Sequence, residues 1–505
     1  MTLDPINLLH NSPFNQMTKR DILKGVRKLL KRRVFFVFAA LFLIFSSSGV
    51  AGAESESIVG SNVILYDEMV DILGQLEEKS NGKLDVFTLR ELGIEEGRSE
   101  TGKDLYVAKI GNGDKKIWVQ GRIHGNEPYG TNATLRLIEN LINEKDASYK
   151  EILNELTVYF IPMYNVDGAN RNQRGTILYD HETGEPKLNE RGQTITVDLN
   201  RDWVDGGFAA IESVGYYKFW AEIKPEFMMD IHHQGNKNFY GTNIPVTLSL
   251  GISLNPGGPT LPNIKGGEFE DLTRQAMVTV YDAMKPYKEF TVDQYITGSN
   301  VIDIRGGVSS GMMLGFNYQG LNPDGHSNPA VFLETSGQFL DGEREPLIQQ
   351  NIIATHAFLS GLASGELYKA DPERWNEVPI RPISGFNTDY QGVIPINPPR
   401  PEIPVKVSAD HIKTLVERYE EIGKFTNKGV AQSLKVHAES LKHYEETGQF
   451  EKVMKHLDGF NKLLDQHKKN NLMTDGTHQM LKANSDYLKV LLEKQKTELP
   501  NGKAS

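Results

Sequence analysis

The sequence predicts an α/β sandwich with a mainly parallel sheet, followed by a small all-α bundle. Between residues 63 and 362, short apolar runs of strand length alternate with longer stretches whose apolar residues recur at helical spacing. Such alternation is typical of a sheet with helices on both faces. Beyond a cluster of prolines at 395–404 the apolar residues follow helical spacing alone. This later part predicts a bundle of roughly 90 residues.

The individual elements follow from the same patterns. The expected strands are short and apolar, at residues 86–89, 105–110, 117–119, 156–161, 227–231 and 330–333. The expected helices have one apolar face, at residues 63–76, 129–141, 211–223, 268–284 and 347–362. The Gly-rich segment 111–114 between two of these strands predicts a hairpin-like turn. Two long segments rich in Gly, Asn and Pro, 241–267 and 298–328, are expected to shape a binding funnel.

The first 53 residues have the layout of a secretory signal. Residues 19–33 are basic, Val34 to Phe45 is almost purely apolar, and small residues end at Ala51-Gly52-Ala53. The alternative is a single membrane anchor, but the apolar run is short of the roughly 20 residues that a spanning helix needs. We therefore expect cleavage and secretion. Met17, just before the basic segment, would give a signal of more usual length as the start.

The composition excludes several kinds of site. The chain contains no Cys, which excludes disulfides, thiolate metal ligands and a Cys nucleophile. The net charge is −11, and without residues 1–33, which hold eight Lys or Arg and two Asp, it is −17. Such an acidic protein is not expected to bind nucleic acid. An exported chain without cysteine fits a bacterium with a single membrane, which predicts an extracellular or wall-associated location.

Three side chains are candidates for a metal site. His124 and Glu127 lie on the turn between the strand at 117–119 and the helix at 129–141, where open α/β sheets place their ligands. His232 ends another apolar strand, and Asp230 two residues earlier is placed to orient it. Two imidazoles and one carboxylate leave a fourth position open, which is the arrangement of a catalytic zinc site.

Other charged residues lie at the ends of the remaining strands. Glu334 ends the apolar run 330–333 and is a candidate general base. The segments 165–174 and 197–203 carry arginines, whose planar guanidinium groups match a carboxylate or an oxyanion. These groups together predict a hydrolytic site.

The order of these motifs resembles that of the zinc carboxypeptidases of the carboxypeptidase A type. The motifs are His-x-x-Glu, Asn-x-Asp-Gly, Asp-x-Asn-Arg, a strand-end His and a late strand-end Glu, over roughly residues 60 to 365. The resemblance implies a mixed, mostly parallel eight-stranded sheet flanked by helices. It implies one zinc ion per chain, with His124, Glu127 and His232 as ligands and Glu334 as general base.

The resemblance also implies how a substrate is held. Asn200 and Arg201 match the residues that bind the free C-terminal carboxylate of the substrate. The family's oxyanion-stabilising Arg falls in segment 165–174, where Arg174 fits better than Arg171 and both remain open. A family Tyr roughly two dozen residues before the base has no clear counterpart, because Met312 and Met313 stand near that spacing, Tyr318 lies closer and Tyr295 further. The preferred substrate side chain therefore stays open.

The C-terminal helices resemble the FIMAH-type module found at the ends of secreted bacterial enzymes. We expect five parts: a signal peptide at 1–53, a zinc carboxypeptidase-like catalytic domain at 54–385, a Pro-rich linker at 386–405, the helical module at 406–495 and a tail at 496–505. The helical module at 406–495 is expected to allow attachment to the cell wall.

The predicted function is that of a secreted carboxypeptidase that removes C-terminal residues from peptides and proteins through metal-activated water. One alternative is a peptidase that acts on cell-wall peptides. Another is a wall-binding or adhesion protein whose catalytic domain is inactive. Zinc content and peptide turnover distinguish an enzyme from a binding protein.

Overall fold

A central eight-stranded sheet organises the chain. The computed structural model describes residues 57–204, 206–252, 268–296, 300–303, 307–337, 343–387 and 393–498. The sheet has the strand order β1-β2-β4-β3-β7-β11-β8-β9, with strands at Leu84–Thr88, Tyr106–Ile110, Leu156–Ile161, Lys115–Gly121, Phe227–Gln234, Ala330–Ser336, Leu248–Ile252 and Val292–Gln294. The four strands β4, β3, β7 and β11 at its centre run parallel, and the outer pairs β1/β2, β2/β4 and β8/β11 are antiparallel.

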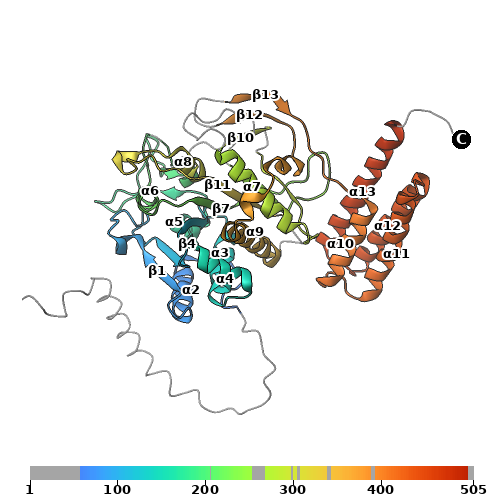
Figure 1. Cartoon of the computed structure of the whole chain (residues 1–505), viewed down its shortest axis with the longest axis horizontal. Coiled ribbons are helices and arrows are strands. Elements are labelled where there is room, and N and C mark those ends of the chain that lie inside the picture. The colour runs from blue at the N-terminus through green and yellow to red at the C-terminus, as the bar shows by residue number, and fades with distance from the viewer. Residues whose placement is uncertain are drawn as a thin grey trace, which may run out of the picture. The chain divides into compact units, whose positions relative to one another are not determined.

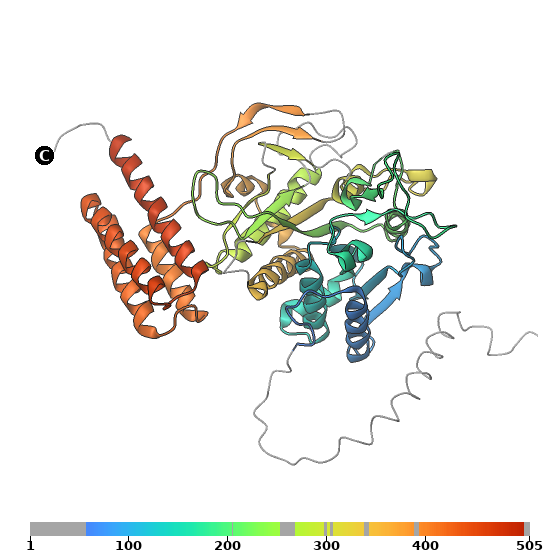
Figure 2. The same ribbon diagram turned by 180° about the vertical axis from the view of Figure 1, so that it is seen from behind.

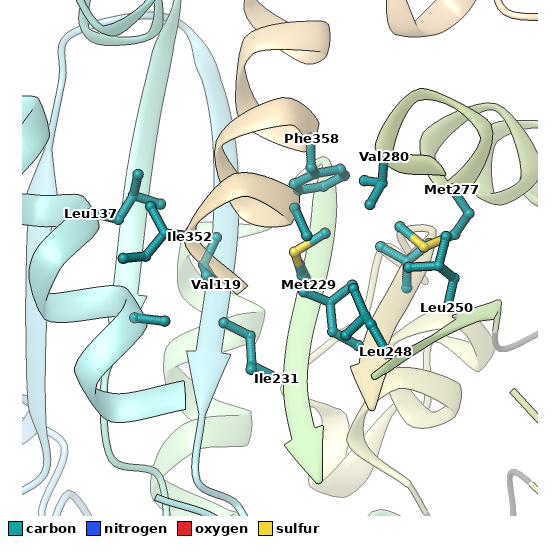
Figure 3. Close-up of a cluster of buried hydrophobic side chains, with 14 of the residues drawn as sticks. Val119, Leu137, Met229, Ile231, Leu248, Leu250, Met277, Val280, Ile352 and Phe358 are labelled. Atoms are coloured by element: carbon teal, nitrogen blue, oxygen red, sulfur yellow. The ribbon is translucent and has the colours of Figure 1, made fainter. Parts of the chain in front are cut away.

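The two faces of the sheet carry different side chains because successive residues of a strand point to opposite faces. On one face, Val119, Met229 and Leu250 pack against helices that lie across the sheet (Figure 3). On the other face, Asp230 and His232 alternate with these apolar residues. Both faces are covered, so the central strands are buried almost throughout.

Helices cover both faces (Figures 1 and 2). The main helices of this part are α2 Tyr66–Lys79, α3 Tyr129–Ile142, α4 Ala147–Glu155, α5 Val166–Arg171, α6 Ile211–Ile223, α7 Glu268–Met284, α8 Val308–Leu314 and α9 Arg344–Ser364. Phe358 of α9 packs edge-on against Phe227 on the apolar face, with the two ring centroids 5.1 Å apart. Phe219 of α6 packs against Trp118 at 5.6 Å, on the opposite face. The predicted fold class is confirmed, including the C-terminal helices.

The hairpin expected at residues 111–114 is wrong. Strands β2 and β3 are not neighbours, because β4 lies between them. The two glycines serve close approach to β4: a Cβ on Gly111 would lie 2.2 Å from the carbonyl oxygen of Leu156, and one on Gly113 would lie 1.8 Å from the carbonyl carbon of Glu155. Glycine in this segment therefore permits a tight crossing over the start of β4.

Part of the proline-rich stretch forms a strand. Strand β13, Ile394–Arg400, pairs antiparallel with β12, Ile383–Asn387, and β12 pairs parallel with β10, Val301–Asp303. A second small sheet joins β5 Thr176–Ile177 to β6 Thr196–Val197. Prolines in β13 are tolerated because the strand lies at the edge of its sheet.

Four helices follow, as the apolar spacing predicts. They are α10 Ala409–Glu421, α11 Lys428–Glu446, α12 Phe450–Lys469 and α13 Asp475–Glu498. Their core includes Ile412, Leu434, Leu457 and Leu488, all nearly inaccessible. The predicted signal lies outside the described residues, and among the helices that are described none is long and apolar enough to cross a membrane.

A carboxyl group in the first turn of helix α6 is buried. Glu212 is inaccessible, accepts a hydrogen bond from Thr176 Oγ1 at 3.2 Å, and has no hydrogen-bond partner for Oε2 among the described residues. Burial, with the nearby charges of Glu100 and Asp167, raises the pKa of Glu212 to about 8. In the folded protein this carboxyl therefore keeps its proton up to about pH 8. In the unfolded chain it loses the proton near pH 4.5, the ordinary pKa of a glutamate side chain.

Glu212→Gln is expected to flatten part of the pH dependence of stability. A raised folded-state pKa contributes stability below about pH 4.5, and that contribution is lost as the pH rises to about 8. Over this interval the free energy of unfolding of the wild type should fall relative to that of the variant, with a limiting slope of about 1.4 kcal/mol per pH unit. Denaturant unfolding of both proteins at several pH values measures the difference. A constant difference would contradict the buried neutral carboxyl.

Candidate metal centre and binding cavity

The turn from β3 to α3 is held by a buried arginine. Arg122 is inaccessible and has φ +58°, a left-handed conformation that is uncommon for a side chain of this kind. Its guanidinium donates to the carbonyl oxygens of Gly125 at 2.9 Å and Ala169 at 3.3 Å. A Cβ on Gly125 would lie 2.0 Å from the carbonyl carbon of Gly168, so the turn packs directly on α5. Arg122 and Gly125 thus fix the backbone that presents His124.

His124, Glu127 and His232 converge at the ends of β3 and β7. His124 Nδ1 lies 2.8 Å from Glu127 Oε1, and His232 Nδ1 lies 3.3 Å from Glu127 Oε2. One ligand atom from each residue lies within 4.8 Å of the others, and all three side chains are buried. Although burial opposes it, the two imidazoles hold the pKa of Glu127 well below its usual range. Two imidazole nitrogens and a carboxylate oxygen match the donors that zinc prefers.

The second nitrogen of His232 is bound to a buried polar chain. Asp230 Oδ2 lies 2.8 Å from His232 Nε2 and accepts from Gln120 Nε2 at 2.9 Å. Gln120 Oε1 in turn accepts from Trp118 Nε1 at 2.7 Å. Although burial opposes it, Asp230 raises the pKa of His232 well above its usual value. This chain fixes the ring so that Nδ1 faces the cluster.

Asp198 occupies the equivalent place beside His124. Its Oδ1 lies 3.2 Å from His124 Nε2, and its Oδ2 accepts from Arg174 Nε at 2.8 Å. It also begins the short helix Leu199–Arg201 by accepting from the N–H of Asn200 at 2.9 Å. Although burial opposes it, His124 and Arg174 hold the pKa of Asp198 well below its usual range. Sequence analysis did not single out Asp198, although it begins the Asp-x-Asn-Arg motif.

Glu334 lies next to His232 across two parallel strands. The two residues are register partners of β11 and β7, so their side chains leave the same face of the sheet about 5 Å apart at the backbone. Burial raises the pKa of Glu334 to about 8, while His232 opposes the shift. A divalent cation at the cluster would favour the ionised form of this carboxyl. With Glu127, Asp198 and Asp230, Glu334 makes a fourth acidic group close to the two imidazoles, and such a group of carboxyls attracts a divalent cation.

These groups line a cavity of about 300 Å³. Its walls contain His124, Arg174, Asn200, Arg201, His232, His233, Gln234, Gly235, Tyr295, Asp303, Gly307, Ser309, Ser310, Phe332 and Glu334. The segment 298–328, expected to shape a funnel, supplies four of these residues. Six of the candidate residues, His124, Arg174, Asn200, Arg201, His232 and Glu334, therefore line the cavity, and Glu127 contacts both histidines.

The arrangement separates the two candidate arginines of segment 165–174. Arg174 lines the cavity, and its Nη1 lies 3.7 Å from Glu127 Oε1. Arg171 ends helix α5, and its Nε and Nη2 are buried without a hydrogen-bond partner among the described residues. Asn165 caps this helix through Gly168 N at 2.7 Å and also donates to the carbonyl oxygen of Arg174 at 3.2 Å. The Asn-x-Asp-Gly motif thus positions the loop that carries Arg174.

Tyr295 and His233 also lie at the cavity, and residue spacing in the sequence did not predict their positions there. Tyr295, left open by the sequence, lines the cavity, and burial together with the charge of Glu334 raises its pKa. Its ring packs edge-on against Phe332 at 5.1 Å. His233, next to a candidate ligand, stacks on Tyr129 at 4.6 Å and accepts from the N–H of Tyr129 at 3.2 Å. Burial lowers the pKa of His233 to about 4, which suits a neutral acceptor.

Comparison with known proteins gives two family matches. Residues 93–221 match the family model described as zinc carboxypeptidase, and residues 409–490 match the FIMAH domain. The chain is 29% identical to carboxypeptidase E of Caenorhabditis elegans over 159 residues, which is 29% of this chain and 31% of that protein. It is 24% identical to human carboxypeptidase A6 over 155 residues, which is 29% of this chain and 33% of that protein.

Among solved structures, one similar chain is carboxypeptidase A of Helicoverpa armigera. Its TM-score is 0.43 at 15% identity, over 69% of this chain and 87% of that one. The matched region spans about a third of the length of the two curated relatives. The resemblance to metallocarboxypeptidases and to the FIMAH module is confirmed by the family matches.

Asp230→Asn tests whether the buried chain behind His232 supports metal binding. The substitution removes the charge that favours the Nε2 proton of His232, so metal affinity is expected to fall about 10- to 100-fold. Competition with a chromophoric zinc chelator measures the affinity. Asp67→Asn, an exposed change in helix α2, is the matched control. Equal zinc affinity in both variants would show that Asp230 does not support the cluster.

Proposed function

We propose, from the zinc carboxypeptidase family that residues 93–221 match, that this protein is a secreted zinc carboxypeptidase. The observation that carries the proposal is the convergence of His124, Glu127 and His232 beside Glu334 in one cavity that also contains two arginines. A metal cluster, a carboxyl group and cationic anchors are the parts that hydrolysis at the end of a peptide needs. One zinc ion per chain is proposed, held by the three buried ligands.

The carboxyl group of Glu334 is proposed as the general base. Zinc, when bound, acts as a Lewis acid that makes water a better nucleophile and polarises the scissile carbonyl. Glu334 accepts a proton from the attacking water and passes it to the amine of the leaving residue. Its place beside His232 on the neighbouring strand supports this role.

The arginines divide two tasks between them. Arg174 forms ion pairs with Asp198 and Glu127 and so lies next to the cluster. From this position its guanidinium is proposed to stabilise the negative charge that develops on the scissile carbonyl oxygen. Arg201 and Asn200 are proposed to bind the C-terminal carboxylate of the substrate. Asn200 is fixed by accepting from the N–H of Val308 at 3.0 Å. A carboxylate bound at this place restricts cleavage to the end of a chain.

The terminal parts of the chain suggest where the enzyme works. The basic, apolar and small-residue layout of residues 1–53 supports secretion from a bacterium. The FIMAH match at residues 409–490 supports a separate role for the helical module, which we propose is attachment to the cell wall. Sedimentation of the purified full-length protein with isolated walls tests the attachment, and a protein that stays in the supernatant contradicts it.

Glu334→Gln is expected to keep zinc and lose nearly all peptide turnover. The amide preserves the shape of the side chain but cannot accept the proton, a loss of about 10²–10⁴-fold in kcat. Zinc content by mass spectrometry and release of C-terminal amino acids are measured together. Glu222→Gln, on an exposed position of α6, is the control. Substantial turnover by Glu334→Gln would refute the proposed base.

Arg201→Gln tests the carboxylate anchor. The value of kcat/KM for peptides with a free C-terminus is expected to fall roughly 10- to 100-fold, because a charge-assisted hydrogen bond is lost. Peptides with an amidated C-terminus lack this interaction and should be affected much less. Arg191→Gln, at an exposed position, is the control. An equal loss on free and amidated peptides would exclude Arg201 as the anchor.

A further inference from the structure

One compartment of the cavity lies between the proposed carboxylate anchor and the metal cluster. Helix α8 forms its side wall, because Asn200 accepts from Val308 N at the start of this helix. Ser309 Oγ approaches Met228 Sδ of β7 at 3.6 Å, so the same helix end reaches the sheet. The compartment is therefore bordered by Asn200, the start of α8 and the floor formed by β7 and β11.

Phe332 forms the floor of this compartment. It precedes Glu334 by two residues on β11, so both side chains leave the same face of the sheet. Phe332 lines the cavity and is only 8% exposed. The ring makes edge-on contacts with His232 and Tyr295, whose ring centroids lie 6.3 Å and 5.1 Å from its own. These contacts hold it between the cluster and the opposite wall. The ring thus occupies depth that a substrate side chain would otherwise use.

Gly251 provides the space in which the ring lies. Gly251 of β8 is the register partner of Phe332. A Cβ on Gly251 would lie 2.1 Å from both Cε2 and Cζ of Phe332, far inside van der Waals contact. The backbone of Gly251 has no left-handed conformation that would require glycine. Glycine is needed here because the ring of Phe332, on the neighbouring strand β11, lies directly over Gly251.

We propose that Phe332, seated on Gly251, restricts the enzyme to substrates whose C-terminal residue has a small side chain, such as glycine, alanine or serine. This inference rests on the proposed carboxypeptidase function. A C-terminal residue with its carboxylate at Arg201 and its amide at the cluster has only its side chain left to face this compartment. The ring covers the floor, and Ser309 and Ser310 line the side, so the described residues around this compartment form no deep apolar pocket for a large side chain.

Peptides that differ only in the C-terminal residue test the restriction. For the wild type, kcat/KM is expected to be higher for terminal Gly and Ala than for terminal Leu and Phe. In Phe332→Ala the ratio of kcat/KM for terminal Phe to that for terminal Ala should rise about tenfold or more. Leu333→Ala removes a buried side chain on the opposite face of the same strand and should leave this ratio unchanged.

Gly251→Ala tests the same contact from the other side. Its methyl group should push the ring into the compartment and lower kcat/KM for terminal Ala relative to terminal Gly. In the double variant Phe332→Ala/Gly251→Ala the clash is absent, so this loss should be relieved. Thermal unfolding and zinc content of each variant show whether the fold and the cluster persist.

The possible failures are distinguishable. If the zinc-loaded wild type releases no C-terminal residue from any peptide, the proposed function is wrong and the restriction with it. If the wild type is active but prefers terminal Phe or Leu, or if Phe332→Ala leaves the ratio unchanged, the restriction by Phe332 is overturned while the function stands. If the double variant keeps the loss seen in Gly251→Ala, the ring is not its cause.

Discussion

The site depends on the carboxyl ends of three parallel strands, β3, β7 and β11, meeting at one edge of the sheet. Their register fixes which side chains face each other: Gln120 pairs with Asp230, and His232 pairs with Glu334. A shift of one residue in any of these strands would turn its functional side chains to the opposite face of the sheet, which carries Val119 and Met229. The alternation of apolar and polar residues in β7 therefore supports both the core and the cluster.

Placing so many charged groups in the interior is costly unless each has a partner. The structure meets this cost with paired interactions around the cluster. Asp230 and Asp198 lie beside the outward nitrogens of the two histidines, and Arg122 binds backbone carbonyls of the turn. The imidazoles, in turn, keep Glu127 ionised. These partners orient the candidate ligands before a cation binds, which reduces the reorganisation that binding requires.

Many of the helices and strands could be predicted from the sequence because the local spacing of apolar residues determines them. The helix Ile211–Ile223 and the strand Leu156–Ile161 have the predicted bounds, since apolar periodicity determines them. Strand order is a different matter: Gly111 and Gly113 look like a hairpin in sequence, and only the position of β4 shows that they permit a crossing. Local patterns do not contain that long-range pairing.

The same limit applies to the cavity. The strand-end positions of His232 and Glu334 were visible in the sequence, as was Asp230. The contact of Asp198 with His124 and Arg174, and the ring of Phe332 over Gly251, join segments far apart in the chain. Arg171 and Arg174 could not be separated by spacing, because only the end of α5 shows which of them reaches the cavity. Side-chain contacts of this kind require the assembled fold.

The most direct test of the metal centre is a crystal structure of the zinc-loaded protein with anomalous data at the zinc edge. A single strong peak is expected about 2.0–2.2 Å from His124 Nδ1, His232 Nδ1 and an oxygen of Glu127. A peak ligated elsewhere, or no peak at this cluster after zinc loading, would contradict the assignment of these three residues as the ligands.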